Sequence, residues 1–284
     1  MKENIENVHK IDVDKAWNSL YSRLDNDRLL TGHTENLSRR VRKISFRWAA
    51  SAAAAVCAGF IFLIFFFPQN KNNSLVFLQN KDNSGALVVT LDDSSVIYLA
   101  SNASIFYPAD FAKNNRKVEL DGNALFFVAK DDKHPFIIET KKDITIEVIG
   151  TVFTVQSSPE NPFELSVKEG KVNVHSKDKK AAIHVEAGET VHLKTTGLTK
   201  TGTANPLIFN HFTEKISFKD EKLDNIIHAI NTMYGYPAVV ADQSLNNRTL
   251  TVTFDNESVE TMTELICMAL NLNQINKQDT IFIK

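Results

Sequence analysis

The sequence of 284 residues predicts a single-pass membrane protein with a mainly-β region, a sandwich or solenoid, followed by a small α+β domain. Three observations support this prediction. An uncharged apolar run occupies residues 48–67, and short β runs separated by turn residues fill residues 68–204. Helical and strand patterns then alternate over residues 205–284. With residues 1–47 as an N-terminal arm, the chain divides into four segments.

The arm of residues 1–47 is too short for a substantial hydrophobic core of its own. Asp12 is a candidate N-cap for a helix in this arm. Four apolar residues recur there at helical spacing: Val13, Trp17, Leu20 and Leu24. A one-sided apolar stripe needs a surface to cover it, which is either a partner protein or the membrane surface. Because the charge of this helix is mixed rather than basic, the pattern favours a partner.

The apolar run extends from Trp48 to Phe67 without a charged residue. Roughly 20 residues at a helical rise of about 1.5 Å span a hydrocarbon core of about 30 Å. A cleaved signal peptide has a shorter apolar core near the start of the chain. The apolar part of a lipoprotein signal would end at Cys57, whereas this run continues to Phe67. A buried helix of a soluble domain rarely lacks polar residues on every face. We therefore expect a transmembrane helix at residues 48–67, in contact with the lipid bilayer.

Basic residues lie on only one side of this run. They are Arg39, Arg40, Arg42, Lys43 and Arg47, whereas Pro68, Gln69 and Asn70 follow the run. By the positive-inside rule, this asymmetry places the N-terminus in the cytoplasm and residues 68–284 on the other side of the membrane.

Composition and motifs argue against several other classes of protein. A formal net charge of -2 gives no basic balance for nucleic acid, so no nucleic-acid partner is expected. The sequence contains no Gly-rich phosphate loop and no CxxC, HExxH or GxSxG motif, so we expect neither a cofactor nor an enzyme. His175, His184 and His192 lie on alternating β runs without the spacing of known metal ligands, which favours a solvated strand face over a metal site.

Residues 68–204 show short β runs at 86–91, 95–99, 124–128 and 144–149. Turn residues separate them at 92–94, 121–123, 168–171 and 187–189. This pattern is typical of a sandwich, a barrel or a solenoid. Residues 164–168 and 171–175 alternate strictly between apolar and polar side chains, which predicts a hairpin with one buried face.

Several motifs follow one another in order across this region. They are LDDSSVIYL at 91–99, ASIFYP at 103–108, RKVELDGNALFFVA at 116–129, HPF at 134–136, VIGTVFTV at 148–155, VKEGKV at 167–172 and AGE at 187–189. Together they resemble the periplasmic domain of FecR-type anti-sigma proteins. Two positions depart from that pattern: Asp93 stands where the family usually has glycine, and Asn123 where it usually has glutamate.

The resemblance implies a regulator of the inner membrane with a cytoplasmic N-terminus and periplasmic C-terminal domains. Its cytoplasmic partner would be an extracytoplasmic-function (ECF) sigma factor, contacted by Val13, Trp17, Leu20 and Leu24, with Trp17 as the main anchor. Its periplasmic partner would be the signalling domain of an outer-membrane TonB-dependent transducer. Envelope proteases would also act on it if regulated proteolysis carries the signal.

Gly150 and Thr151 fill the Gly-Thr-x-Phe motif of this family, and some FecR-like regulators cleave themselves at such a bond. The hydroxyl of Thr151 would attack the carbonyl of Gly150 and give an ester that water then opens. This chemistry needs backbone strain and donors for the oxyanion. The alternative is that Gly150 is a bulge and Thr151 an ordinary strand residue, and we favour it because a motif alone does not show strain.

Residues 205–284 predict the order β-α-β-β-α-β-β, with two helices on one face of a small sheet. The strands are expected at 216–218, 239–241 and 249–254, with a final hairpin of 271–275 and 280–283. Asp220 is the expected cap of the first helix, Gly235 its end, and Ser258 the start of the second. This order resembles the STN-like domain that ends many FecR-type regulators.

A second class of function stays open. The arm is shorter than the usual anti-sigma segment of the family, so the protein is alternatively a membrane-anchored periplasmic scaffold or glycan-binding module with an inert arm.

Overall fold

The computed structural model describes residues 13–27, 74–81, 85–111, 115–176, 182–202 and 206–284. The chain divides into two compact units, residues 1–70 and 71–284, and each is described by itself. Within the described residues, no helix is both long enough and apolar enough to cross a membrane. The predicted span at 48–67 and the basic residues from Arg39 to Arg47 lie outside the described part.

The first unit contains helix α1, Val13–Asn26, as the apolar spacing in the arm predicts. Asp12, the expected cap, lies just outside the described residues.

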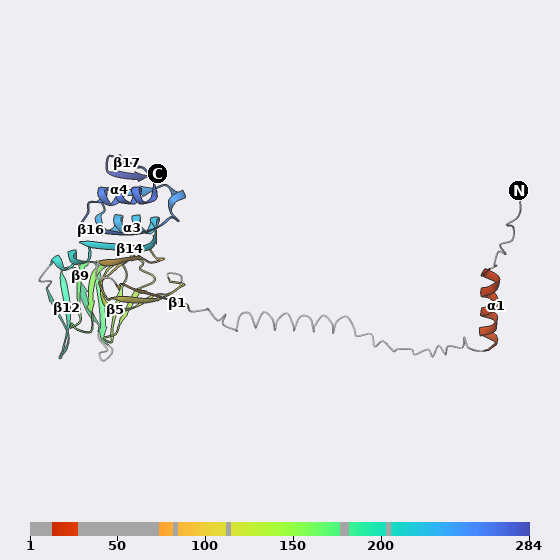
Figure 1. The fold of residues 1–284 in the computed structure, drawn as a ribbon. Helices are drawn as coiled ribbons and strands as arrows, with labels where there is room; N and C mark the ends of the chain where they lie inside the picture. Colours follow the sequence, from red (N-terminus) through yellow and green to blue (C-terminus); the bar gives the residue numbers. More distant parts are fainter. Residues whose placement is uncertain (1–12, 28–73, 82–84, 112–114, 177–181, 203–205) are drawn as a thin grey trace. The chain divides into compact units, whose positions relative to one another are not determined.

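The second unit begins with a β-rich region (Figure 1). Its strands are β1 (Leu75–Gln79), β2 (Ala86–Thr90), β3 (Val96–Leu99), β4 (Ser104–Pro108), β5 (Arg116–Phe127), β6 (Phe136–Thr140), β7 (Ile144–Val148), β8 (Val152–Ser157), β9 (Glu164–Glu169), β10 (Lys171–Ser176), β11 (Ile183–Glu186), β12 (Glu189–Lys194) and β13 (Gly197–Gly202).

These strands form two sheets that share β5. The first sheet has the order β11-β10-β7-β6-β5-β4-β1. The second runs β13-β12-β9-β8-β5-β3-β2 and continues into the C-terminal region. Side chains from both sheets fill one core, among them Ile105, Ile138 and Val174 of the first sheet and Ile97, Phe153 and Leu165 of the second. The region is therefore mainly β, as predicted, and its two sheets, continuous through β5, form a nearly closed sandwich around this core.

The turn expected at 121–123 is wrong, because β5 runs straight through it. Arg116 to Leu120 pair with β6 in the first sheet, and Gly122 to Phe127 pair with β8 in the second. Gly122 has φ +103°, and a Cβ there would lie 2.8 Å from the Cα of Ala103. Only glycine fits this conformation and this close approach, so the strand passes from one sheet to the other at Gly122.

The hairpin predicted from 164–168 and 171–175 is also wrong. Strand β9 pairs with β8 and β12 in the second sheet, whereas β10 pairs with β7 and β11 in the first. Gly170 separates them with φ +88°. The alternation correctly indicates strands with one buried face, but it does not indicate which strands pair.

The C-terminal region contains η1 (Pro206–Ile208), η2 (Asn210–Phe212), β14 (Lys215–Lys222), α3 (Leu223–Tyr234), β15 (Ala238–Ala241), η3 (Gln243–Leu245), β16 (Thr249–Asp255), α4 (Val259–Leu270), β17 (Gln274–Lys277) and β18 (Thr280–Ile283). The predicted order of strands and helices is confirmed. Gly235 ends α3 in the left-handed conformation, and the side chain of Ser258 accepts a hydrogen bond from the Thr261 N–H at the start of α4.

Asp220 does not cap α3, contrary to the prediction. Lys222 occupies the cap position without a side-chain hydrogen bond, and Asp220 lies in β14 with φ +49°, where the register against β16 shifts. Asp220 is a residue type that often caps helices, but β14 continues to Lys222, beyond the predicted end at residue 218, so Asp220 lies inside the strand.

The two helices do not cover one face of a single sheet. Strands β14 and β16 extend the second sheet of the sandwich, because β14 pairs with β2 in parallel. Strands β15, β18 and β17 form a separate three-stranded sheet. Helices α3 and α4 lie between these two sheets (Figure 1). The sandwich and the C-terminal region therefore share a sheet, and the division predicted at residue 205 stays a prediction.

A second core joins the two regions. Strand β3 is buried on both faces: Ile97 and Leu99 face the sandwich core, whereas Val96 and Tyr98 pack with α3 and α4 residues such as Ile226. This explains why β3 reads as an unbroken apolar run rather than as an alternating one. Among the described residues, the Tyr98 hydroxyl has no hydrogen-bond partner, and burial raises the pKa of Tyr98 far above its usual value, so the group stays neutral.

Arg116 is a buried cation at the start of β5, with its side chain only 2% exposed. Its Nε donates to Asp93 Oδ2 at 2.8 Å, Nη1 to the carbonyl of His134 at 2.8 Å, and Nη2 to the carbonyl of Ala129 at 2.6 Å. Asp93 also accepts from the N–H and the hydroxyl of Ser95. The network thus joins the β2–β3 turn, β5 and the segment before β6.

We predict that Arg116→Ala lowers the free energy of unfolding by about 3–5 kcal/mol, because it leaves the Asp93 carboxylate buried without its cation. Lys117→Ala is the matched control, since its ion pair with Glu139 is solvent-exposed and contributes at most about 1 kcal/mol. The two tryptophans, Trp17 and Trp48, do not belong to the second unit, so tryptophan fluorescence would not report its unfolding. Urea unfolding of both variants is therefore followed by far-UV circular dichroism. Equal losses for the two variants would contradict the prediction.

Candidate functional site

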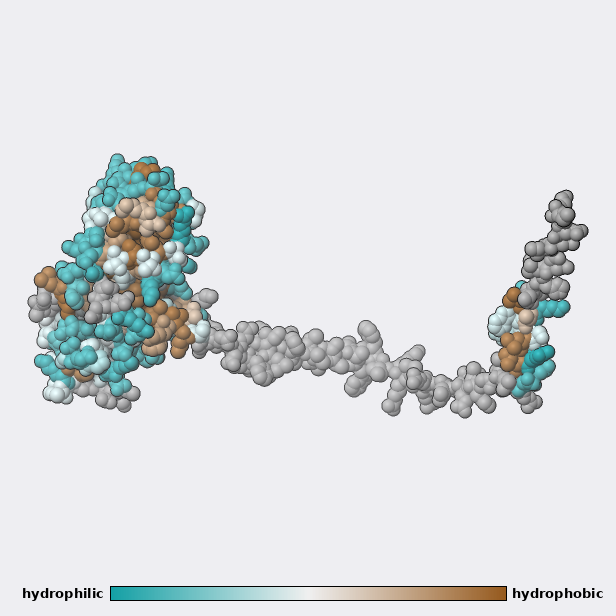
Figure 2. Space-filling model, viewed as in Figure 1, coloured by the Kyte–Doolittle hydropathy of each residue, from teal (hydrophilic) through white to brown (hydrophobic). Residues whose placement is uncertain are grey.

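Helix α1 presents the predicted stripe to solvent. Val13, Trp17 and Leu20 are 58%, 56% and 47% exposed, and Leu24 is half-buried. Apolar surface gathers along one side of the helix (Figure 2). Because large apolar side chains in a row are costly to leave in water, the stripe is a candidate binding surface.

Tyr21, which is not among the predicted contact residues, extends this stripe. Tyr21 is 60% exposed, and its ring centroid lies 6.4 Å from that of Trp17. Tyr21 follows Trp17 by four residues, and this spacing indicates that the two side chains share one face of the helix. The candidate surface therefore holds two adjacent aromatic rings, which are the side chains that most often dominate small interfaces.

Gly150 and Thr151 lie in the connection between β7 and β8. A Cβ at Gly150 would lie 2.8 Å from the Cα of Lys130, which leaves room only for glycine. The Thr151 side chain is buried, and its hydroxyl donates to the carbonyl of Lys171 at 3.0 Å. A Cβ at Gly170 would in turn lie 2.9 Å from the carbonyl oxygen of Gly150. The hydroxyl therefore has a structural partner that joins this connection to β10.

Lys130 and Asp131 lie against the Gly150–Thr151 bond. The backbone N–H of Asp131 donates to the carbonyl of Ile149 at 2.7 Å. A hydrogen bond with the His134 ring, joined by the N–H groups of Lys133 and His134, lowers the pKa of Asp131 to about 2. A carboxylate with so low a pKa is a weak general base. Both interpretations of the Gly150–Thr151 bond, self-cleavage and an ordinary strand connection, stay predictions.

The three histidines singled out in the sequence do not come together around a common point. His184 Nδ1 lies 2.5 Å from Asn173 Oδ1, and His192 Nδ1 lies 3.3 Å from Glu164 Oε2. In the ranges that the structure describes, no group of three or more His, Cys, Asp or Glu side chains is arranged to hold a metal ion. Cys267 is a buried free thiol on α4, and burial raises its pKa.

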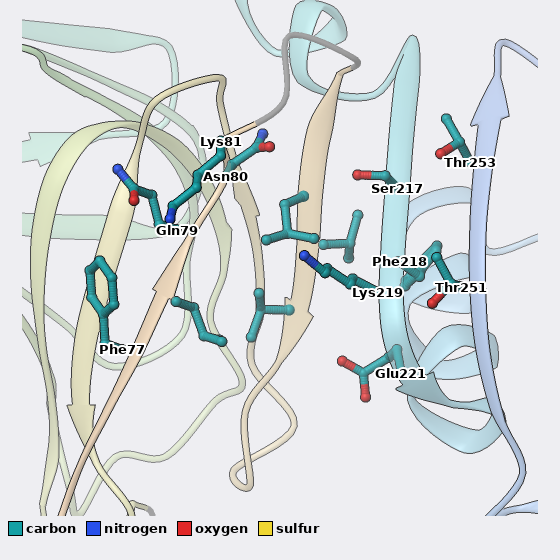
Figure 3. Close-up of a pocket in the computed structure, with 14 residues that line it drawn as sticks. Phe77, Gln79, Asn80, Lys81, Ser217, Phe218, Lys219, Glu221, Thr251 and Thr253 are labelled. Carbon is teal, nitrogen blue, oxygen red and sulfur yellow. The ribbon is translucent and has the colours of Figure 1, made fainter.

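A groove of about 580 Å³ lies where β1 and β2 face β14 and β16 (Figure 3). Phe77, 49% exposed, stands at one side of it, and apolar surface continues over β1 in Figure 2. Lys219 extends from β14 into the groove, whereas Glu221 is held by Asn225 Nδ2 at 2.6 Å. The sequence could not predict this groove, because its sides come from the sandwich and from the C-terminal region.

Two segments of the chain match known families. Residues 81–173 match the family described as FecR protein, and residues 215–283 match the family described as FecR, C-terminal. Both segments are FecR-family domains. The first contains Arg116, Gly150, Thr151 and Gly170, and the second contains every helix and strand from β14 to β18. Helix α1 precedes both FecR-family segments.

Two crystal structures are similar to this chain, and both are of a protein described as a "putative anti-sigma factor" from Parabacteroides distasonis ATCC 8503, at 2.50 Å and 1.65 Å resolution. Each is 23% identical and covers 74% of this chain and 98% of its own, with TM-scores of 0.46 and 0.44. A comparison with curated proteins found no match.

For the FecR-family Gly-Thr bond, we predict that the purified chain keeps one intact mass and that Thr151→Val does not change it apart from the substitution. Thr151→Val should lower the free energy of unfolding by about 1 kcal/mol, because the Lys171 carbonyl loses its donor. Thr151→Ser keeps the hydroxyl and serves as the control. Two fragments in the unmodified protein that Thr151→Val abolishes would instead identify Thr151 as a nucleophile.

Proposed function

We propose that this protein is a sigma-factor regulator that relays a periplasmic signal through a single inner-membrane helix at residues 48–67 to an ECF sigma factor in the cytoplasm. The FecR-family match of residues 81–173 and 215–283 supports a regulatory role. The uncovered stripe on α1 is the observation that carries the proposal, because it gives the arm a surface for a protein partner.

The sigma factor binds the stripe of Val13, Trp17, Leu20, Tyr21 and Leu24. An amphipathic helix of this kind docks its apolar side in a groove of its partner, with anchors at i, i+3, i+4 and i+7. Of the five, Trp17 and Tyr21 offer the largest contact area at a low cost in side-chain entropy.

On the periplasmic side, we propose that the signalling domain of an outer-membrane TonB-dependent transducer binds the STN-like region of residues 205–284. An apolar row crosses the three-stranded sheet there, since Phe282 is paired in register with Val240 on one side and Ile275 on the other. Val240 and Ile275 are 45% and 38% exposed. A row of this kind on a sheet face suits a protein partner.

A second candidate function is supported by the groove beside Phe77. An exposed aromatic ring next to hydroxyl and amino groups suits a glycan, and a periplasmic scaffold or glycan-binding module would use the groove without the arm.

We predict that immobilised residues 1–47 retain one sigma factor from native cytoplasm and that Trp17→Ala abolishes this retention, because the change removes the largest apolar contact. Ser19→Ala is the matched control, since Ser19 lies on the opposite side of α1 and should leave binding unchanged. Mass spectrometry identifies the retained proteins. Retention of the same proteins by both variants would contradict the assignment of the stripe.

We further predict that deleting residues 2–40 from the full chain changes the same transcripts as Trp17→Ala does, measured by RNA sequencing. Arg42, Lys43 and Arg47 remain in the deletion, so the predicted topology is kept. A scaffold or glycan-binding protein would show no change in transcription with either variant, and that outcome would favour the second candidate.

A further inference from the structure

Strand β16 forms an open edge of the second sheet. In the part of the chain that the structure describes, β16 pairs only with β14, and the register shift of that pair lies in β14, at Lys219 and Asp220. Its sequence, TLTVTFD, contains no proline, and Asp255 is its only charged residue. Edges of soluble proteins are usually protected by prolines, bulges or central charges. This edge has none of them.

The hydrogen bonds at the two ends of β16 show which backbone groups face the open edge. The Asn256 N–H donates to the Glu214 carbonyl at 2.6 Å, and the Arg248 carbonyl accepts from the Leu223 N–H at 2.7 Å. Even-numbered residues therefore turn their backbone groups toward β14, because these groups alternate along a strand. Thr249, Thr251 and Thr253 turn theirs to the open edge.

The open stretch ends at Asp255, whose N–H donates to the carboxylate of Glu257. The usable edge is thus Thr249 to Thr253. Side chains along it separate by face: Thr249, Thr251 and Thr253 are exposed, whereas Leu250 and Val252 are half-buried and pack against the second core.

This stretch is complementary to itself. When two copies run antiparallel with Thr251 opposite Thr251, Thr249 lies opposite Thr253, and both pairs bring outward-facing backbone groups together. Each pair then exchanges two backbone hydrogen bonds. On one face threonines meet threonines, and on the other Leu250 meets Val252, and both kinds of cross-strand pair stabilise a sheet.

Charge does not oppose this arrangement. No charged residue lies between Thr249 and Thr253, and Asp255 would stand opposite the neutral Asn247 of the second copy. The other open edges of the C-terminal region are less suitable, because β15 and β17 have four residues each and β17 carries Lys277.

We propose that two copies of this chain pair through β16 about a two-fold axis at Thr251, so that their second sheets form one continuous sheet. The partner surface is the same in both copies, as closed two-fold assemblies require. This pairing does not depend on the proposed function, since it uses neither the arm nor a transducer.

Single cysteines introduced into β16 test the register with Thr251 opposite Thr251. The full chain is used in native membranes, with its own cysteines removed by Cys57→Ser and Cys267→Ser. With mild oxidation, Thr251→Cys should convert most of the chain to a covalent dimer, because Cα atoms of a hydrogen-bonded pair lie about 5.5 Å apart, within disulfide reach. Thr249→Cys and Thr253→Cys alone should stay monomeric, since each would lie several residues from its own copy. Thr249→Cys combined with Thr253→Cys should restore the dimer.

A proline removes the N–H of the edge without removing a bond to β14. Thr253→Pro should therefore abolish the dimer formed by Thr251→Cys, whereas Thr253→Val, which keeps the N–H, should preserve it. Three outcomes would overturn the proposal: no dimer from Thr251→Cys, equal dimer from all three single cysteines, or a disulfide from Thr251→Cys to a different protein.

Discussion

The buried guanidinium of Arg116 is the interaction on which the arrangement of the second unit depends. It holds Asp93, and Asp93 in turn fixes Ser95, so the β2–β3 turn has one conformation. Ser94 within that turn accepts a hydrogen bond from His228 Nε2 of α3 at 2.9 Å. The buried Arg116 thus fixes a turn of the sandwich that also contacts helix α3, whose side chains pack in the second core. A buried charge is costly unless all its donors are satisfied, and here every donor nitrogen of the guanidinium has an acceptor.

The second sheet contains strands from both FecR-family segments. Its strands β2, β3 and β5 supply side chains to the sandwich core on one face and to the helical core on the other. The parallel pairing of β2 with β14 covers only two residue pairs, so most of the attachment comes from buried side chains rather than from backbone hydrogen bonds. The groove beside Phe77 is lined by strands of both the sandwich and the C-terminal region, β1 and β2 on one side and β14 and β16 on the other.

The sequence predicted the local elements well and the connections between them poorly. The apolar spacing located α1, and alternation located the strands, because both patterns report which face of an element is buried. The turn predicted at Gly122 is instead a bend inside β5, and the break predicted at Gly170 is present but joins strands of different sheets rather than the two strands of a hairpin. Which strands then pair depends on distant contacts that no local pattern contains. Asp93 holds its turn locally through Ser95, but its ion pair with Arg116, 23 positions away, is a distant contact that the turn pattern does not contain.

The arm differs from the second unit in what stabilises it. Helix α1 has 14 residues and its apolar stripe is uncovered, whereas isolated helices shorter than about 12–15 residues are marginal in water. Most of the stability of such a helix comes from packing its apolar face, so a partner that covers Trp17 and Tyr21 also stabilises the helix itself. Binding and helix formation are then coupled, and part of the contact energy is spent on ordering the arm. A partner that releases the arm therefore also returns it to a less ordered state, which makes the stripe suited to reversible rather than permanent association.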